Sequence, residues 1–230
     1  MGAAPACYAE HTVDKDGATQ SPVWVVDFDG TLALHDVGDE LCDSFADPAW
    51  RDVGAAWRRG ELTLPEAQRR MWASVRVDRE TMVRRAREVG ALRPGAESLF
   101  AAARRGEVRL VLASGGFDLY VEAILGDRLE LFEAVYVNHL EPGPAGPALS
   151  FPHTEVAAGP YAVCKAAVVR RHGAEAFFGD GSSDRSVAGQ VPRLHVVRGS
   201  LLERVCNEQG HPCIPFESFD EVLPAGADTR

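Results

Sequence analysis

The 230-residue chain is poor in lysine, in long apolar runs and in paired cysteines. Lysine and arginine together number 24, yet only Lys15 and Lys165 are lysines, so arginine serves wherever a generic positive charge suffices. No apolar stretch approaches the length of a membrane-spanning helix, and the opening residues lack the charged and apolar regions of a signal peptide. We therefore expect a cytoplasmic protein with no membrane partner.

Cysteine usage and net charge argue against two further classes. The five cysteines, at positions 7, 42, 164, 206 and 213, form no Cys-x-x-Cys pair and leave one over in any pairing, which favours reduced thiols over a disulfide scaffold. The net charge of −10 argues against a nucleic-acid partner, because affinity for a phosphate backbone depends on a basic face.

The most informative stretch is VWVVDFDGT, residues 23–31. Four apolar residues are typical of a strand covered on both faces, and Asp27 and Asp29 follow two residues apart, on one face if the strand continues. Gly30 allows a sharp turn beside a ligand, and the Thr31 hydroxyl can donate to an anion. Two neighbouring carboxylates favour a cation between them, and oxygen ligands suit Mg²⁺. The run predicts a phosphoryl-transfer site.

Three downstream segments also carry groups that handle phosphate. Residues 114–116 (Ser-Gly-Gly) end an apolar run, Lys165 opens a helix-like run, and residues 179–184 (GDGSSD) follow another apolar run. Backbone amides beside glycine form an anion cradle, and a lysine kept in so lysine-poor a chain indicates a need for a compact cation. An Asp-x-Asp-Gly-Thr run alone is also typical of a surface turn, but the other segments favour the phosphate site.

In order and spacing, the four segments resemble the signature motifs of the haloacid dehalogenase (HAD) superfamily of aspartate-nucleophile phosphatases. The resemblance spans most of the chain and implies an α/β fold with a Rossmann-like parallel sheet. It implies that Asp27 is the nucleophile of an aspartyl-phosphate intermediate and Asp29 the general acid and base. Ser114 and Gly115 would bind the phosphoryl oxygens, and Lys165 would neutralise the charge of nucleophile and phosphate.

The resemblance also implies a Mg²⁺ site formed by Asp27, the backbone carbonyl of Asp29, and Asp180. A further set would orient these groups from behind: Thr31, Ser183 and Asp184. The family's dehalogenases and cation pumps have no aspartate two residues after the nucleophile. Asp29 therefore favours phosphate-ester hydrolysis or mutase chemistry.

Composition and periodicity divide the chain into three parts. Residues 1–20 are polar and predict a loose tail, and residues 36–90 have helical spacing and predict a small helical cap. Residues 21–35 and 91–230 alternate helices with apolar strands, which predicts a parallel-sheet core with its active site at the strand carboxyl ends. The predicted cap helices are 39–45, 50–59, 65–74 and 79–89. The predicted core helices are 97–105, 119–125 and 165–172, and the predicted core strands are 108–113, 134–138, 176–179 and 194–197. Residues 141–160 predict a hairpin or loop over the site.

A helical cap directly after the first motif resembles the phosphoserine phosphatase branch of the superfamily. Two residues depart from that branch. Asp36 stands where that enzyme has a glutamate for the substrate ammonium, and Met71 stands where it has a cap arginine for the carboxylate.

The phosphatases of methionine salvage, which act on 2-hydroxy-3-keto-5-methylthiopentenyl-1-phosphate, are a closer match. The matching segments are 60–72, 114–118, 136–138, 151–153, 164–165 and 214–216. The cysteine-rich segment that usually precedes that family's lysine is reduced here to Cys164. The resemblance makes Asp36, Arg70, Met71 and Trp72 candidates for contacts with the substrate. Packing within the cap for Met71 and Trp72, and a solvated helix face for Arg70, remain open.

We therefore expect a Mg²⁺-dependent phosphatase that hydrolyses a small-molecule phosphate monoester. A phosphoserine phosphatase remains an alternative, as does a phosphotransferase or mutase that passes the phosphoryl group to a second alcohol. The complete set of Asp27, Asp29, Lys165 and Asp180 disfavours a silent binding module. The sequence leaves the physiological ester and the oligomeric state open.

Overall fold

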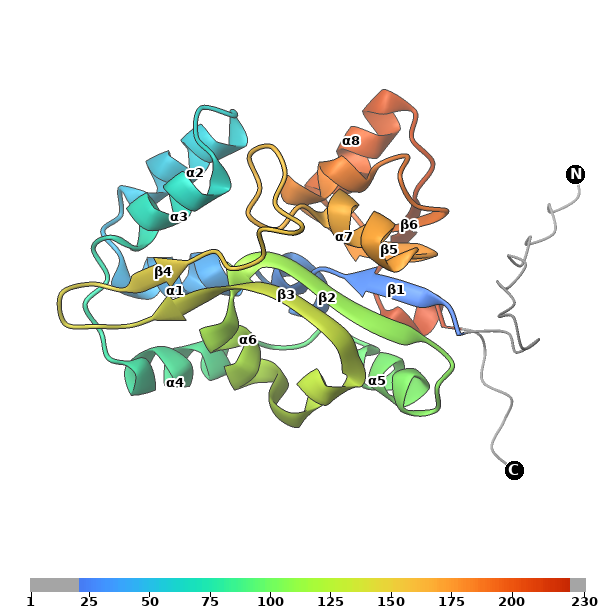
Figure 1. The fold of residues 1–230 in the computed structure, drawn as a ribbon, viewed down its shortest axis with the longest axis horizontal. Helices are drawn as coiled ribbons and strands as arrows, with labels where there is room; N and C mark the ends of the chain where they lie inside the picture. Colours follow the sequence, from blue (N-terminus) through green and yellow to red (C-terminus); the bar gives the residue numbers. More distant parts are fainter. Residues whose placement is uncertain (1–20, 224–230) are drawn as a thin grey trace, which may run out of the picture.

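The computed structural model of the chain describes residues 21–223, so the tail predicted over residues 1–20 lies outside the described part (Figure 1). Seven strands form one sheet in the order β4-β3-β2-β1-β5-β6-β7. All neighbouring strands are parallel except β4, which pairs antiparallel with β3. The strands are β1 (Val23–Val26), β2 (Arg109–Phe117), β3 (Phe132–Glu141), β4 (Ala148–Ser150), β5 (Ala176–Gly179), β6 (Arg193–Val197) and β7 (Ile214–Phe216). The predicted α/β class with a parallel sheet is confirmed.

Eight α-helices surround the sheet in the described residues. They are α1 (Val37–Phe45), α2 (Trp50–Arg58), α3 (Leu64–Trp72), α4 (Arg79–Val89), α5 (Ala96–Arg104), α6 (Asp118–Leu125), α7 (Lys165–His172) and α8 (Leu201–Gln209). Short 3₁₀ helices span Gly126–Leu131, Ser183–Val187 and Phe219–Glu221. None of the helices found between residues 21 and 223 is long and apolar enough to cross a bilayer.

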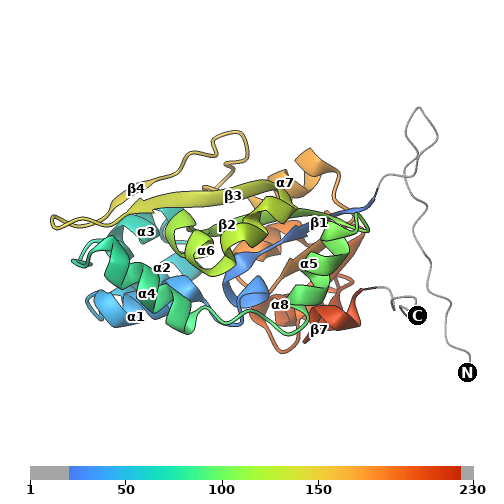
Figure 2. The same ribbon diagram turned by 90° about the horizontal axis from the view of Figure 1, so that it is seen from below.

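Strand β1 divides its side chains between two cores, one on each face of the sheet. Trp24 and Val26 belong to the core that α5 and α6 cover, whereas Val23 and Val25 belong to the core under α7 and α8. Successive side chains of a strand point to opposite faces, so a fully apolar strand requires cover on both. Figures 1 and 2 show α5 and α6 on the opposite side of the sheet from α7. The sheet is therefore the middle layer of three.

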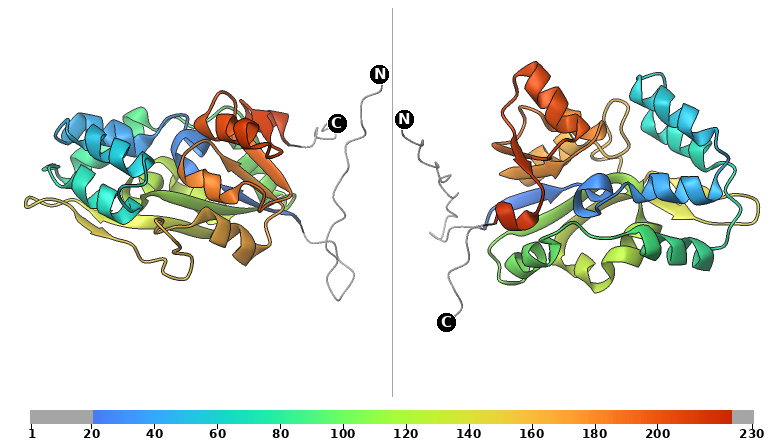
Figure 3. Two further views of the ribbon diagram at one scale, coloured as in Figure 1. Left: turned by 90° about the horizontal axis from the view of Figure 1, so that it is seen from above. Right: turned by 180° about the vertical axis from the view of Figure 1, so that it is seen from behind.

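Helices α1 to α4 follow β1 directly and gather at one end of the sheet. α2 and α3 lie side by side, while α4 lies next to the core helix α6, where Gly90 brings the backbone close to Ile124 (Figure 3). α3 begins with a capping box: Thr63 accepts from the N–H of Glu66, and the Glu66 carboxylate accepts from the N–H of Thr63. The helix predicted to begin at Pro65 thus begins one residue earlier, at Leu64.

The segment between β4 and α7 crosses towards the paired helices α2 and α3 (Figure 1). The N–H of Leu64 donates to the carbonyl of Pro160 at 2.8 Å, and the ring of Tyr161 meets that of Trp57 edge to face at 5.7 Å. Residues 141–160 begin as the predicted hairpin and continue as a loop that contacts α2 and α3. These two helices, with α1 and α4, occupy the segment predicted as the cap and are called the cap helices below.

His195, in β6, is a titratable group inside the sheet. Its ring stacks on Phe178 of β5 with centroids 4.5 Å apart, and only 6% of the residue is exposed. Burial, assisted by the charge of Arg193, lowers the pKa of His195 to about 4. The unfolded chain binds a proton at His195 near the ordinary value of about 6.5, so this group destabilises the fold only as the pH falls below that value.

Replacing His195 with phenylalanine should therefore remove part of the acid sensitivity. Between about pH 7.5 and about pH 5, wild type should lose about 2 kcal/mol more unfolding free energy than His195→Phe, as measured by urea titration. His35→Gln, which alters an exposed histidine, should behave like wild type. Equal acid sensitivity in wild type and His195→Phe would contradict a neutral buried imidazole.

Candidate active site

The predicted catalytic side chains meet at the carboxyl edge of the sheet. Asp27 follows β1, Asp180 follows β5, Ser114 lies in the last part of β2, and Lys165 is the first residue of α7. Carboxyl ends of parallel strands share one edge, so residues far apart in the chain are brought to one place. All four residues, together with Asp29, line a cavity of about 300 Å³ between this edge and the cap helices.

The turn after β1 differs from the expected continuous strand. β1 ends at Val26, and Phe28–Leu32 form a wide turn with Gly30 at φ 71°, in which the N–H of Ala33 donates to the carbonyl of Phe28. A Cβ at Gly30 would lie 2.5 Å from a carboxylate oxygen of Asp180, so only glycine permits both the turn and this close approach. Asp27 and Asp29 therefore lie beyond the end of the strand, and both line the cavity. Their side chains have separate partners.

Lys165 is the centre of the buried charges. Its Nζ lies 2.7 Å from Asp27 Oδ2 and 2.5 Å from Asp184 Oδ1, and it donates to Ser183 Oγ at 2.9 Å. Burial alone would lower the pKa of Lys165, but the carboxylates of Asp184 and Asp27 outweigh it and raise that pKa above its ordinary range. Lys165 is therefore a permanent cation against the predicted nucleophile.

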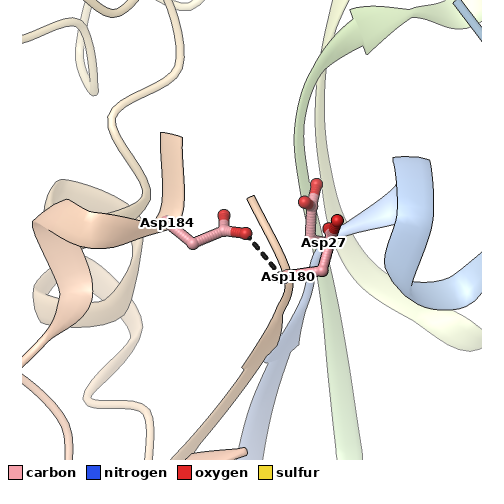
Figure 4. Close-up of side chains that lie close together, drawn as sticks. All are labelled: Asp27, Asp180 and Asp184. Carbon is pink, nitrogen blue, oxygen red and sulfur yellow. Dashed lines mark hydrogen bonds between the residues drawn. The ribbon is translucent and has the colours of Figure 1, made fainter. Parts of the chain in front are cut away.

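Asp184 holds the lysine and the neighbouring loop together. Its Oδ2 accepts from the N–H groups of Asp180 and Gly181 at 2.9 and 2.8 Å, while Oδ1 faces Lys165. Figure 4 shows the Asp184 side chain directed at the backbone of Asp180, whose own carboxylate turns towards Asp27. Thr31, from the turn after β1, donates to Asp180 Oδ1 at 3.0 Å. Thr31, Ser183 and Asp184 all lie where they can orient the groups that line the cavity.

Three carboxylates form a cluster whose chemistry fits a divalent cation. Asp27, Asp180 and Asp184 each place an oxygen within 4.8 Å of the others. Burial and the neighbouring Asp184 raise the pKa of Asp27 well above its usual range, and the same two causes raise that of Asp180 to about 7. Lys165 balances only part of this negative charge. Mg²⁺ prefers hard oxygen ligands, and the carboxylate oxygens of this cluster carry negative charge that Lys165 does not fully balance.

Asp29 has its hydrogen-bond partners outside the carboxylate cluster, in the core and at the start of α1. Its Oδ1 accepts from the N–H of Val37, the first residue of α1, at 3.0 Å. Its Oδ2 accepts from the hydroxyls of Tyr120 at 3.0 Å and Ser114 at 3.3 Å. Burial, followed by the charge of Asp36, raises the pKa of Asp29 to about 8. A carboxyl that exchanges its proton near neutral pH is suited to act as both acid and base.

Three of the four residues proposed for substrate contact line the cavity. Met71 and Trp72 line it from α3, and Asp36 lines it at the start of α1. Arg70 does not line it and lies exposed on another face of α3. Helical spacing explains this: Leu64, Gln68, Met71 and Trp72 share the face that meets the cavity, and Arg70 lies off that face. Arg70 thus lies on the solvated helix face that the sequence left open for it, and its contact with the substrate stays a prediction.

Several cavity residues were not anticipated from the sequence: Asp39, Trp57, Arg58, Gln68 and Tyr120. Helical spacing from Met71 could have found Gln68. Trp57 and Arg58 reach the cavity only because α2 packs beside α3, and no local pattern signals that arrangement. The same holds for Tyr120, which depends on how α6 leaves the end of β2.

The chain belongs to the haloacid dehalogenase-like hydrolases, whose family model matches residues 24–189. It is therefore a hydrolase, and the resemblance drawn from the four motifs is confirmed.

Among curated proteins, the chain is similar to 2-hydroxy-3-keto-5-methylthiopentenyl-1-phosphate phosphatases. That of Exiguobacterium sibiricum is 27% identical over 205 residues, covering 86% of this chain and 92% of the relative. That of Geobacillus kaustophilus is 26% identical over 215 residues, covering 90% and 96%.

Among solved structures, a substrate-bound phosphoserine phosphatase has a TM-score of 0.67 at 16% identity and covers 90% of this chain and 98% of its own. An aspartyl-phosphate analogue of phosphoserine phosphatase has a TM-score of 0.65 at 17% identity, covering 89% and 98%. These structures share the fold of this chain.

Replacing Lys165 should destabilise the fold, because its buried carboxylate partners would then be left without a cation. In EDTA at about pH 8, Lys165→Met should lower the free energy of unfolding by about 3 kcal/mol or more, because Asp27 and Asp184 lose their shared cation. Urea unfolding would measure the loss.

The matched control is Arg105→Met, which breaks an exposed ion pair with Glu107 and should cost less than about 1 kcal/mol. If the two variants lost equal stability, the buried lysine would not be compensating the carboxylates as described.

Proposed function

We propose that this hydrolase is a phosphomonoesterase that works through an aspartyl-phosphate on Asp27. The observation that carries the proposal is the pairing of the buried Asp27 with Lys165 at 2.7 Å in a cavity that Asp29 also lines. A carboxylate held against a fixed cation is a nucleophile that an anionic phosphate can approach.

In the first step, an oxygen of Asp27 attacks phosphorus while the bond from phosphorus to the ester oxygen breaks. Asp29 gives its proton to the departing oxygen, so the product leaves as a neutral alcohol. In the second step, Asp29 takes a proton from water, the water oxygen attacks phosphorus, and the Asp27 carboxylate is released together with inorganic phosphate. Ser114 and the amide of Gly115 would hold the phosphoryl oxygens throughout.

Asp27, Asp180 and the backbone carbonyl of Asp29 would hold Mg²⁺, with Asp184 orienting Asp180 and Lys165. A bound Mg²⁺ supplies positive charge that offsets the mutual repulsion of carboxylates and phosphate. The carboxylate cluster and its partial compensation by Lys165 support this assignment.

For the substrate, we favour an ester like the one named for the curated relatives, 2-hydroxy-3-keto-5-methylthiopentenyl-1-phosphate. Trp57, Met71 and Trp72 supply apolar and aromatic surface on the cap side of the cavity, which suits a thioether group. Arg58, also on that side, can donate to substrate carbonyl or hydroxyl oxygens.

An amino-acid phosphate such as phosphoserine is the second candidate. Arg58 lines the same cavity as Asp36 and Asp39, so a guanidinium for a carboxylate and carboxylates for an ammonium are both available. The fold shared with phosphoserine phosphatases agrees with this alternative.

Phosphate release from a panel of monoesters tests the proposal and separates the two substrates. The panel contains the methylthio-enol phosphate, phosphoserine and sugar phosphates, each assayed with Mg²⁺ and with EDTA. We expect Mg²⁺-dependent turnover, and Asp27→Asn should lower kcat by at least about a thousandfold through loss of the nucleophile. Asp127→Asn, at an exposed site, should leave turnover unchanged. Turnover that survives in Asp27→Asn would disprove the aspartyl-phosphate route.

Thermal unfolding tests the metal site without using activity. Mg²⁺ at about a hundredfold excess over its dissociation constant should stabilise wild type by about 2.7 kcal/mol, because the ion binds the folded state. Asp180→Asn should lose most of this stabilisation, yet unfold in EDTA no more readily than wild type, because one of the mutually repelling carboxylates is gone. Asp127→Asn should respond to Mg²⁺ like wild type. An unchanged Mg²⁺ response in Asp180→Asn would place the ion elsewhere.

A further inference from the structure

Tyr120 is a buried cavity residue to which the reaction above assigns no role. It lies in the first turn of α6, and only 1% of it is exposed. Its ring packs against Phe28 at 6.0 Å and against Phe117 at 6.5 Å, so the aromatic core fixes the direction of the side chain. Its hydroxyl lies 3.0 Å from Asp29 Oδ2.

Two glycines make room for this hydroxyl beside Asp29. A Cβ at Gly116 would collide with the Tyr120 hydroxyl and with Asp29 Oδ2. A Cβ at Gly38, in the first turn of α1, would lie 3.3 Å from the same hydroxyl. The contact between Tyr120 and Asp29 therefore depends on small residues in both β2 and the first cap helix.

We propose that Tyr120 is a positioning residue whose hydroxyl holds the Asp29 carboxyl in the orientation from which it protonates the leaving oxygen. The inference rests on the proposed function. Of the two hydroxyls on Oδ2, that of Ser114 has the longer contact, 3.3 Å, and is the one assigned to a phosphoryl oxygen. When Ser114 turns to the phosphate, Oδ2 gains room for the leaving oxygen and keeps Tyr120 as its side-chain donor.

The bond from Tyr120 strengthens as the reaction proceeds. Before transfer, Oδ2 carries the proton and is a weak acceptor. As the proton passes to the ester oxygen and the phosphorus–oxygen bond breaks, Oδ2 becomes a carboxylate oxygen, and hydrogen bonds to charged acceptors are the stronger ones. An interaction that is stronger in the transition state than in the ground state accelerates the step.

The test compares two esters that differ in their need for an acid. An alkyl phosphate such as glycerol phosphate expels a basic alkoxide unless a proton is supplied, whereas nitrophenyl phosphate expels a stable phenolate. Tyr120→Phe, which keeps the ring and removes the hydroxyl, should lower kcat/KM for the alkyl ester by about tenfold or more and change that for the aryl ester little. In an Asp29→Asn background, Tyr120→Phe should have no further selective effect.

Two other variants control for folding and for hydroxyl loss in general. Tyr136→Phe also removes a buried hydroxyl, one that bonds to His172 outside the cavity, and should leave both esters unaffected. Gly38→Ala crowds the Tyr120 hydroxyl without altering its ring, and should reproduce the alkyl selectivity in weaker form.

An equal loss on both esters in Tyr120→Phe, or no loss on either, would overturn the positioning role while leaving Asp27-dependent hydrolysis intact. Failure of the proposed function would instead appear as wild-type activity that does not depend on Asp27 with either ester.

Discussion

The contact between the buried ammonium of Lys165 and the carboxylates of Asp27 and Asp184 is the interaction on which the site depends. Three aspartates converge at the ends of two neighbouring strands, and without a cation their mutual repulsion would oppose the fold. Lys165 offsets part of that charge and leaves a net negative cluster. A divalent cation would neutralise this remaining negative charge. The same four side chains, Asp27, Lys165, Asp180 and Asp184, therefore determine both the stability of this region and its capacity to bind a metal.

Asp29 connects this charged floor to the cap. One of its oxygens accepts from the backbone at the start of α1, and the other from side chains of β2 and α6. A single carboxyl therefore contacts the first cap helix and the core at once. If the cap helices move relative to the sheet, the hydrogen bond from Val37 is the one that changes, while that from Tyr120 belongs to the core and remains. The orientation of the acid would then be set mainly by α6.

The sequence was sufficient to predict those features that depend on local pattern. The apolar run of β1, the Gly30 turn, the helix that begins near Pro65 and the helix opened by Lys165 each carry their signal within a few residues, and each forms near its predicted place. The motif order then brought the catalytic residues to one sheet edge, since parallel strands share their carboxyl end.

What the sequence could not supply comes from packing between elements. β1 was expected to continue through Asp29, but the strand ends at Val26 and the turn at Phe28–Leu32 follows. Arg70 was proposed from the resemblance of segment 60–72 to a known cap, and that resemblance does not show which face of the helix meets the cavity. Trp57 and Arg58 depend on the pairing of α2 with α3. The final helix and strand, α8 and β7, went unpredicted even though Ser200 and Gly210 cap that helix.

Arg93 supports the turn after β1 that carries the first motif. This arginine is buried, and it donates from Nε to the carbonyl of Thr31 and from Nη2 to that of Gly30, each at 2.6 Å. Its guanidinium lies 5.8 Å from the ring centroid of Phe216 in β7. The turn that carries Asp29 thus leaves two carbonyls to be satisfied by a side chain, and a planar fork of donors suits them where a lysine would satisfy fewer. The two kinds of cation thus have different roles at the site. The compact ammonium of Lys165 contacts the carboxylates, whereas the guanidinium of Arg93 donates to the backbone of the turn beside them.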